Sequence, residues 1–117
     1  MTLLLVGFAG AAGVLARYAI STPLHGDVLP WATVAINVAG SFLLGILVSS
    51  HSFSADVRTV VGVGFLGGFT TFSTFTVQAF LDLEAGEPLR ALIYVAASLI
   101  FGLAAAAAGY YLGREAF

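Results

Sequence analysis

Long apolar runs alternate with short polar breaks along the whole chain. The four runs lie near residues 3–20, 30–49, 59–81 and 89–112. Each has about the 20 residues that a helix needs to cross the hydrocarbon core of a bilayer. The breaks between them leave room for loops only. The pattern therefore predicts an all-α membrane protein in which residues 1–117 form a single domain of four transmembrane helices.

The first run opens with "MTLLLVGFAGAAG", a stretch that also has the apolar character of a signal peptide. No Lys or Arg precedes it and the apolar residues continue beyond it, so we expect a retained first helix instead. Small residues recur there at Gly7, Gly10 and Gly13, and in the third run at Gly64 and Gly68. Such residues let two backbones approach closely, and we expect most of them to lie in helix–helix contacts.

The third run contains a passage that is unusual for a membrane span, "GGFTTFSTF" at residues 67–75. Gly67 and Gly68 weaken a helix, and the hydroxyls of Thr70 and Thr71 can bond the backbone groups that a break would free. A break in mid-membrane is tolerated only where protein or water covers it. We expect the third helix to be broken here. Such breaks expose carbonyl oxygens, so the residues alone allow a cation site built from backbone carbonyls.

Composition supports the membrane assignment and removes several functions. The chain is 60% hydrophobic and only 9% charged, whereas about a quarter of the residues in a soluble domain are charged. The net charge is -2 and there is no basic run, so we expect no nucleic acid partner. Cysteine is absent, which excludes disulfides, thiol catalysis and thiolate metal sites.

The arginines are balanced between the two sides of a four-span chain, and there is no lysine. Arg58 and Arg114 belong to one side, Arg17 and Arg90 to the other. A bias of Lys and Arg is what orients a small membrane protein. A chain without one is expected to insert in both directions, and an antiparallel homodimer is the simplest consequence. The alternative is that four arginines carry too little signal and that other determinants decide the orientation.

Ionisable side chains that could do chemistry are missing from the middle of the runs. All six acidic residues fall in loops or at run ends. A proton-coupled transporter normally needs such a group inside the membrane, which counts against a small multidrug exporter. Ser73 has no buried histidine or acid to activate it, and His25 and His51 lie in loops, so we expect no enzyme.

Polar residues follow one face of two of the predicted helices. They are Thr33, Asn37, Ser41 and Gly45 in the second run, and Tyr94, Ser98 and Gly102 in the fourth. Interhelical packing explains such stripes well, and we favour it for Ser41, Gly45 and Gly102. Asn37 lies near mid-span, where polar groups are costly and often functional, so packing and an ion pathway both remain open for it.

Phe72 and Phe75 suggest an anion instead of a cation. They are three residues apart on one helical face, and the edge of an aromatic ring is electropositive. Moving an ion to the bilayer centre costs at least a few kcal/mol, while a hydrogen bond to a charged group returns about 1.5–3 kcal/mol. Donors such as Asn37, Ser73 and Thr74 would therefore have to share the ion. Alternatively, the two rings only pack or face lipid.

The motifs "GVLARY", "INVAGSFLLG" and "GGFTTFSTF", in this order along the chain, resemble those of the Fluc family of fluoride channels, also called CrcB proteins. The resemblance covers the whole chain. It implies a fluoride-selective channel in the cell inner (plasma) membrane that exports cytoplasmic fluoride passively. It also implies an antiparallel, dual-topology homodimer with two pathways at the subunit interface and a central structural sodium ion.

The resemblance also implies roles for individual residues. Phe72 and Phe75 would present ring edges to fluoride, and Asn37 would donate a hydrogen bond to it. The backbone carbonyls of Gly67 and Thr70, from both subunits, would bind the sodium. The other residues implied for the pathway are Ser73, Thr74, Tyr94 and Ser98, with Arg17 in the aqueous vestibule.

This chain departs from the family in its fourth run, which continues as "AAAAAG" where members carry a further hydroxyl. Two other functions stay open on the sequence. One is a non-transporting helical membrane subunit that binds a partner through its glycine and hydroxyl stripes. The other is a small dual-topology multidrug transporter.

Overall fold

The computed structural model describes residues 1–22 and 29–117, without the side chains of residues 29 and 30, and this part of the chain is helical throughout except for short connections. The expected loop positions of His25 and Asp27 lie outside the described residues. The first two helices are α1 (Thr2–Ser21) and α2 (Leu29–Ser49), and the last is α6 (Pro88–Ala116). Between them lie α3 (Ala55–Val57), the π-helix η2 (Arg58–Leu66), α4 (Gly67–Phe69) and α5 (Ser73–Glu84).

Four helical segments in the described part of the chain are long and apolar enough to cross a membrane, as the hydropathy pattern predicted. They are Thr2–Ser21, Trp31–Ser49, Ala55–Glu84 and Pro88–Ala116. The last of them is a single helix of 29 residues, which makes it about 44 Å long. It exceeds the roughly 30 Å hydrocarbon thickness, so we expect it to tilt in the bilayer.

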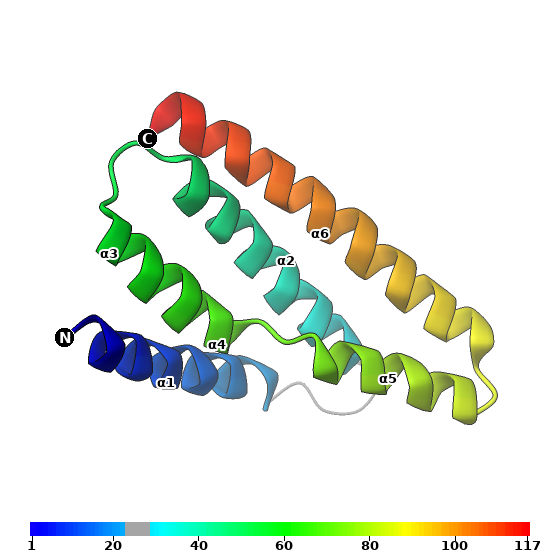
Figure 1. Ribbon diagram of the computed structural model, residues 1–117. Coiled ribbons are helices and arrows are strands. Elements are labelled where there is room, and N and C mark those ends of the chain that lie inside the picture. The colour runs from blue at the N-terminus through cyan, green and yellow to red at the C-terminus, as the bar shows by residue number, and fades with distance from the viewer. Residues whose placement is uncertain (23–28) are drawn as a thin grey trace.

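The third segment is interrupted, but not at the glycines. Gly67 and Gly68 are helical, in α4, and the backbone leaves the helix at residues 70–72. Thr70 is extended, with φ -89° and ψ 161°, and α5 begins at Ser73. Figure 1 shows the extended connection between α4 and α5. The break thus lies within the stretch 67–75 where it was expected, at the threonines that follow the glycine pair.

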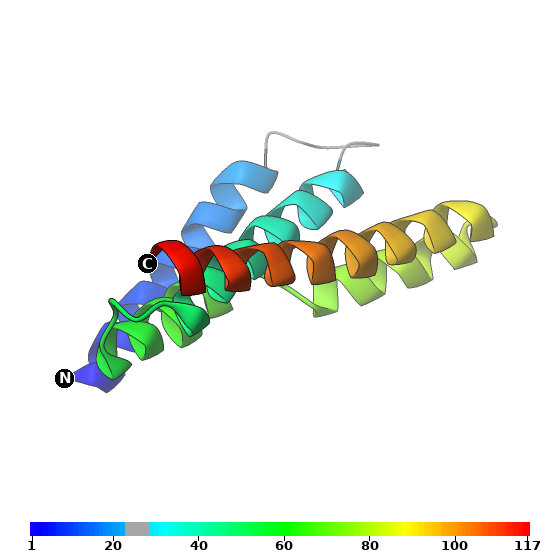
Figure 2. The ribbon, with the colours of Figure 1, turned by 90° about the horizontal axis from the view of Figure 1, so that it is seen from above.

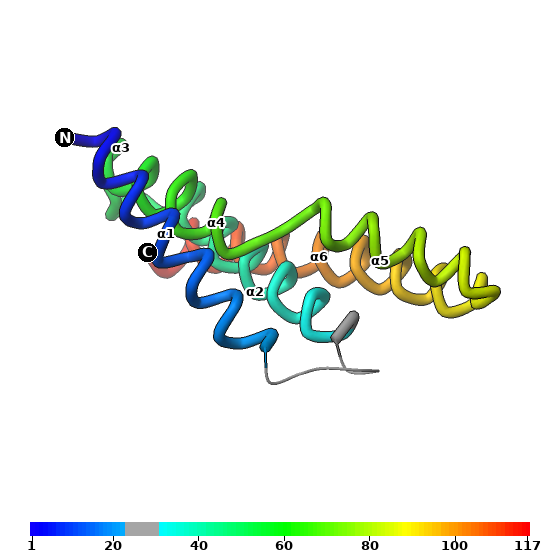
Figure 3. Tube along the Cα trace, turned by 90° about the horizontal axis from the view of Figure 1, so that it is seen from below, coloured from blue at the N-terminus to red at the C-terminus, as the bar shows by residue number. Residues whose placement is uncertain are grey.

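The two halves of the third segment pack on different partners. α2 and α6 share the most extensive helix contact, η2 and α4 pack against α1, and α5 packs against α6. Figures 2 and 3 show the same arrangement from above and from below. Both chain termini and the α2–α3 connection lie at one end of the molecule, and the α5–α6 turn lies at the other (Figure 1). The break thus lies where the third segment leaves its contact with α1 and begins its contact with α6.

Glycines allow these close helix contacts. A Cβ atom on Gly13 of α1 would lie 2.1 Å from the carbonyl oxygen of Phe65, and one on Gly68 would lie 2.5 Å from that of Gly10. The predicted packing role of the α1 and third-run glycines is confirmed at these positions, whereas Gly7 meets no atom within 4 Å. Gly45 packs on α6 in the same way, with its Cβ position 2.5 Å from the Ala106 oxygen.

Candidate functional site

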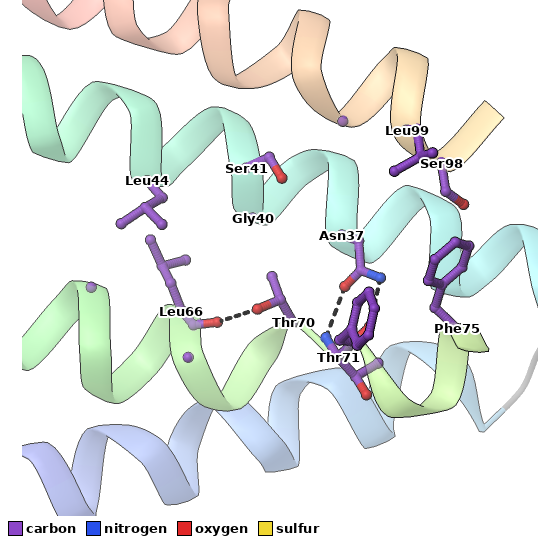
Figure 4. Close-up of a pocket in the computed structure, with 14 residues that line it drawn as sticks. Asn37, Gly40, Ser41, Leu44, Leu66, Thr70, Thr71, Phe75, Ser98 and Leu99 are labelled. Atoms are coloured by element: carbon purple, nitrogen blue, oxygen red, sulfur yellow. Dashed lines mark hydrogen bonds between the residues drawn. The ribbon is translucent and has the colours of Figure 1, made fainter. Parts of the chain in front are cut away.

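A crevice of about 320 Å³, mostly apolar but with several polar side chains, lies beside the helix break, between α2, the third segment and α6. Figure 4 shows its wall, with α2 contributing one row of side chains and the break another. The polar and aromatic lining residues are Asn37, Ser41, Thr70, Thr71, Phe72, Phe75 and Ser98. The crevice therefore brings together side chains that lie up to 61 positions apart in the sequence, from Asn37 to Ser98.

Asn37 holds the break through two hydrogen bonds to one residue. Its Oδ1 accepts from the backbone N–H of Thr71 at 2.8 Å, and its Nδ2 donates to the backbone oxygen of Thr71 at 2.8 Å. This pairing fixes the orientation of the amide, since a flipped amide would set donor against donor. The second N–H of Nδ2 has no hydrogen-bond partner among the described residues, so it remains available to a ligand in the crevice (Figure 4).

The hydroxyls of the break bond backbone groups at the end of α4 and the start of α5, and the Leu66 oxygen also keeps its helical bond from the Thr70 N–H at 3.0 Å. Thr70 Oγ1 donates to the Leu66 oxygen at 2.9 Å, and Thr71 Oγ1 accepts from the backbone N–H of Thr74 at 3.3 Å. These side chains therefore stabilise the end of α4 and the start of α5, where backbone groups lack helical partners.

As a result, two backbone carbonyls are released. In an unbroken helix the N–H groups of Thr71 and Thr74 would bond the oxygens of Gly67 and Thr70, four residues earlier. Instead, Thr71 donates to Asn37 and Thr74 donates to the Thr71 hydroxyl. The oxygens of Gly67 and Thr70, which the sequence analysis assigned to a cation, thus lack their helical donors. No group of three or more His, Cys, Asp or Glu side chains able to hold a metal occurs in residues 1–22 and 29–117.

Arg17 reaches the break from α1. Its Nε donates to the backbone oxygen of Gly68 at 3.3 Å, and the side chain is half-buried. Gly68 lies in the last turn of the helix that ends at Phe69, and a positive charge is favourable at a helix C-terminus. Arg17 therefore stabilises the end of this half-helix, a contact that the sequence analysis did not anticipate.

Three aromatic rings form a continuous row beside the break. The ring centroids of Phe72 and Phe75 are 5.9 Å apart, and those of Phe75 and Tyr94 are 5.2 Å apart at an interplanar angle of 60°. Phe72 is the N-cap residue of α5, with helical backbone angles, and its oxygen accepts from the Thr76 N–H at 2.9 Å. The two phenylalanines therefore lie on one face of the helix, as the spacing predicted. Phe72 is 74% exposed in the single chain.

The other predicted site residues do not all meet in the crevice. Ser73 and Thr74 line a separate surface pocket on α5, and Tyr94 lines a cavity at the α5–α6 end. Ser98 does line the crevice, and its buried Oγ has no hydrogen-bond partner in the described part of the chain. Gly102 also lines it and meets no atom within 4 Å of a Cβ position, so it makes no close helix contact within the single chain.

Sequence reasoning missed two residues of this region. Thr71 supplies both backbone groups that Asn37 bonds, and only the tertiary contact reveals the pair. Asp82 lies near the end of α5, as expected, yet is only 7% exposed. In the sequence Asp82 directly follows the third apolar run, and position near a helix end does not distinguish a buried side chain from a solvated one.

The sequence of this chain is similar to those of one known protein family. The family model described as "CrcB-like protein, Camphor Resistance (CrcB)" matches residues 4–110. A protein of Chlorobaculum tepidum named fluoride-specific ion channel FluC is 43% identical, over 95% of this chain and 93% of its own length. Proteins with the same name are 40% identical in Thermus thermophilus, over 94% of this chain and 93% of their length, and 35% identical in Hydrogenovibrio crunogenus, over 100% and 94%.

Proposed function

The chain belongs to the family of CrcB-like proteins, and on this basis we propose that it is a fluoride-selective channel through which cytoplasmic fluoride leaves the cell passively. It is a multi-pass membrane protein and not an enzyme. The observation that carries the proposal is the convergence of Asn37, Phe72 and Phe75 on one crevice at a helix break.

The crevice offers an anion several weak partners and no full charge that would hold it. The edges of the Phe72 and Phe75 rings are electropositive, and one amide N–H of Asn37 has no partner among the described residues. The buried Ser98 hydroxyl, which has no partner in the part of the chain that the structure describes, supplies a further donor in the crevice lining. Each hydrogen bond to a charged group returns about 1.5–3 kcal/mol, so several partners together offset a desolvation cost of several kcal/mol. Shared binding of this kind allows an ion to enter and also to leave.

Export needs no coupled energy source. Hydrogen fluoride crosses a membrane as a neutral molecule and dissociates in the cytoplasm, where the anion is trapped. A channel in the plasma membrane lets this anion leave down its electrochemical gradient. The membrane potential assists with about 2.3 kcal/mol per charge for each 100 mV.

A second copy of the chain would complete the pathway. The crevice is open along one side, and the apolar Phe72 next to it is 74% exposed. The two-against-two division of the arginines supports an antiparallel arrangement, since no charge bias selects one orientation. We therefore propose an antiparallel homodimer with two pathways at its interface.

A structural sodium ion would bind at the released carbonyls. The oxygens of Gly67 and Thr70 have lost their helical donors, and hard cations prefer such oxygen ligands. Two oxygens from each subunit would hold the ion, which would supply a positive charge that fixes the carbonyls of the two breaks. If so, replacing sodium with a large organic cation lowers the melting temperature of the purified dimer. An identical melting temperature in both buffers would contradict this assignment.

The proposed function is tested by anion efflux from liposomes that contain only the purified chain. The liposomes are loaded with fluoride or with chloride, valinomycin relieves the voltage, and an ion-selective electrode follows release. We expect fast loss of fluoride and retention of chloride. No loss of either ion from a folded protein would favour a non-transporting subunit, and proton-dependent export of an organic cation would favour a multidrug transporter.

A further inference from the structure

A second cavity lies at the α5–α6 end of the molecule, away from the helix break. It has a volume of about 270 Å³, and its lining includes Trp31 of α2, Asp82 of α5, and Arg90 and Tyr94 of α6. We call it the α5–α6 chamber. None of the functions assigned above uses Asp82 or Arg90.

The chamber contains a buried carboxylate that is only partly paired. Asp82 Oδ1 lies 3.8 Å from Arg90 Nε and accepts from Gln78 Nε2 at 3.4 Å. The Asp82 side chain is 9% exposed, whereas that of Arg90 is 42% exposed. Asp82 Oδ2 is buried and has no hydrogen-bond partner among the described residues. A buried charge with an unsatisfied oxygen is costly, which calls for a role beyond joining two helices.

Tyr94 connects the chamber to the crevice. Its side chain is only 2% exposed; Thr33 lies near its hydroxyl, but no described residue bonds that hydroxyl with good geometry. The Tyr94 ring contacts the ring of Phe75 at a centroid distance of 5.2 Å. Phe75 lines the crevice and Tyr94 lines the chamber. This ring contact therefore joins the lining of the crevice to the lining of the chamber.

The chamber also lies at the boundary with water. Trp31, at the start of α2, is 49% exposed, and tryptophan gathers at membrane–water interfaces. Glu87 and Arg90, beside the α5–α6 turn, are exposed. The chamber therefore lies beside the Phe75–Tyr94 contact and next to solvent, where an anion that left the crevice at this end would pass.

We propose that Asp82 acts as a tethered competitor for the permeating anion, and that the Asp82–Arg90 pair sets how strongly fluoride is held at this mouth of the pathway. This inference rests on the proposed function. Arg90 is the positive side chain that lines the chamber, and the Asp82 carboxylate already lies against it. Conduction requires binding that is favourable enough for entry but weak enough for release. Asp82 weakens the attraction of Arg90 for fluoride and so permits release.

The test compares the fluoride dependence of efflux in wild type, Asp82→Asn, Arg90→Gln and the double variant. Asp82→Asn keeps the shape but removes the competing charge. We expect its half-saturating fluoride concentration to fall by about two- to fivefold, which is the change in binding that corresponds to the energy of a partly exposed ion pair. Its maximal efflux rate should fall as well, because fluoride is released more slowly. Arg90→Gln leaves the carboxylate alone at the mouth, so its half-saturating concentration rises. The double variant returns close to wild type.

Two controls separate this role from a structural one. Arg114→Gln makes the same charge change at an arginine that pairs with Glu115 outside the chamber, and it leaves the fluoride dependence unchanged. The melting temperature of each dimer reports folding independently of flux. If Asp82→Asn does not fold, Arg90→Gln still carries the predicted rise in half-saturating concentration.

The outcomes also separate this inference from the proposed function. Variants that conduct with the wild-type fluoride dependence, whatever their melting temperature, would overturn the role of the Asp82–Arg90 pair and leave the channel intact. Absence of fluoride flux from the folded wild-type protein would remove the proposed function, and with it this inference.

Discussion

Individual side chains at the break combine two tasks, which is visible most clearly at Asn37. Two atoms of its amide bond Thr71 across the gap in the third segment, and the remaining N–H of this crevice-lining residue has no partner among the described residues. The same hydrogen bonds release the Gly67 carbonyl. A single residue therefore couples the shape of the break to the chemistry of the site, and the rings of Phe72 and Phe75 are positioned by the backbone that Asn37 holds.

Replacing the aromatic rings should stop conduction without disturbing assembly. Phe72→Ile and Phe75→Ile keep an apolar side chain but remove the electropositive ring edge, so we expect fluoride efflux to be abolished while the dimer persists. Efflux from liposomes and the oligomeric state in detergent are the measurements. Phe80→Ile is the matched control, because Phe80 is an exposed α5 phenylalanine outside the crevice. Wild-type efflux in both test variants would disprove the role of the rings.

Removing the Asn37 amide should affect stability as well as flux. Asn37→Ala deletes two hydrogen bonds of 2.8 Å to Thr71, each of which contributes about 1 kcal/mol. We expect the free energy of unfolding of the protein to fall by about 2 kcal/mol and fluoride efflux to be lost. Ser41→Ala, in the same crevice wall, should change stability far less. Equal stability of the two variants would show that the pairing with Thr71 contributes nothing.

At the scale of helices, the third segment works as two half-helices with different neighbours. Its first half is fixed against α1 by glycine contacts and by Arg17, and its second half packs against α6. The sequence predicted that this segment would break, because glycines and hydroxyls interrupt an apolar run. It placed the break within residues 67–75 but not at residues 70–72 in particular. The exact position depends on which backbone groups find partners in α1 and α2, not on local propensity alone.

Two glycines of α1 offer a direct test of the helix contact. A Cβ on Gly13 would lie 2.1 Å from the Phe65 oxygen and 2.9 Å from the Phe69 nitrogen, both backbone atoms that cannot move aside cheaply. We expect Gly13→Ala to destabilise the protein by about 1–3 kcal/mol through overpacking. Gly7→Ala meets open space and should be neutral or stabilising by up to about 1 kcal/mol. Chemical unfolding of both variants in detergent measures this difference, and similar values would argue against the close α1–η2 packing.

At the scale of the whole molecule, the two ends differ in what they expose. One end carries both termini and the α2–α3 connection, and the other carries the α5–α6 turn and its chamber (Figure 1). In an antiparallel dimer, each membrane surface would carry the end with the termini from one subunit and the end with the α5–α6 turn from the other. The two mouths of each pathway would then be built from different ends of different subunits.

Dual topology can be tested with single cysteines, because the native chain has none. Ser52→Cys and Glu84→Cys place one thiol at each end, at exposed positions. We expect a membrane-impermeant thiol reagent to label a comparable fraction of both variants in intact cells, since balanced arginines do not select an orientation. Labelling of one variant alone would show a fixed orientation and would exclude the antiparallel homodimer.

The sequence by itself determined the class of the protein, because spans of about 20 apolar residues and the scarcity of charge follow directly from composition and hydropathy. It also determined that the third segment would break and that several of its glycines would pack. These features depend on neighbours within one turn of helix or on the solvent, so local pattern suffices. The resemblance of three motifs added the family.

Only the tertiary structure decided which of the polar residues act together. Asn37, Phe75 and Ser98 meet in the crevice, while Tyr94, from the same stripe as Ser98, lines another cavity. Asp82 is buried although it lies near a helix end. Each of these outcomes depends on how helices far apart in sequence cross and rotate against one another, and the period of a single helix carries no information about that geometry.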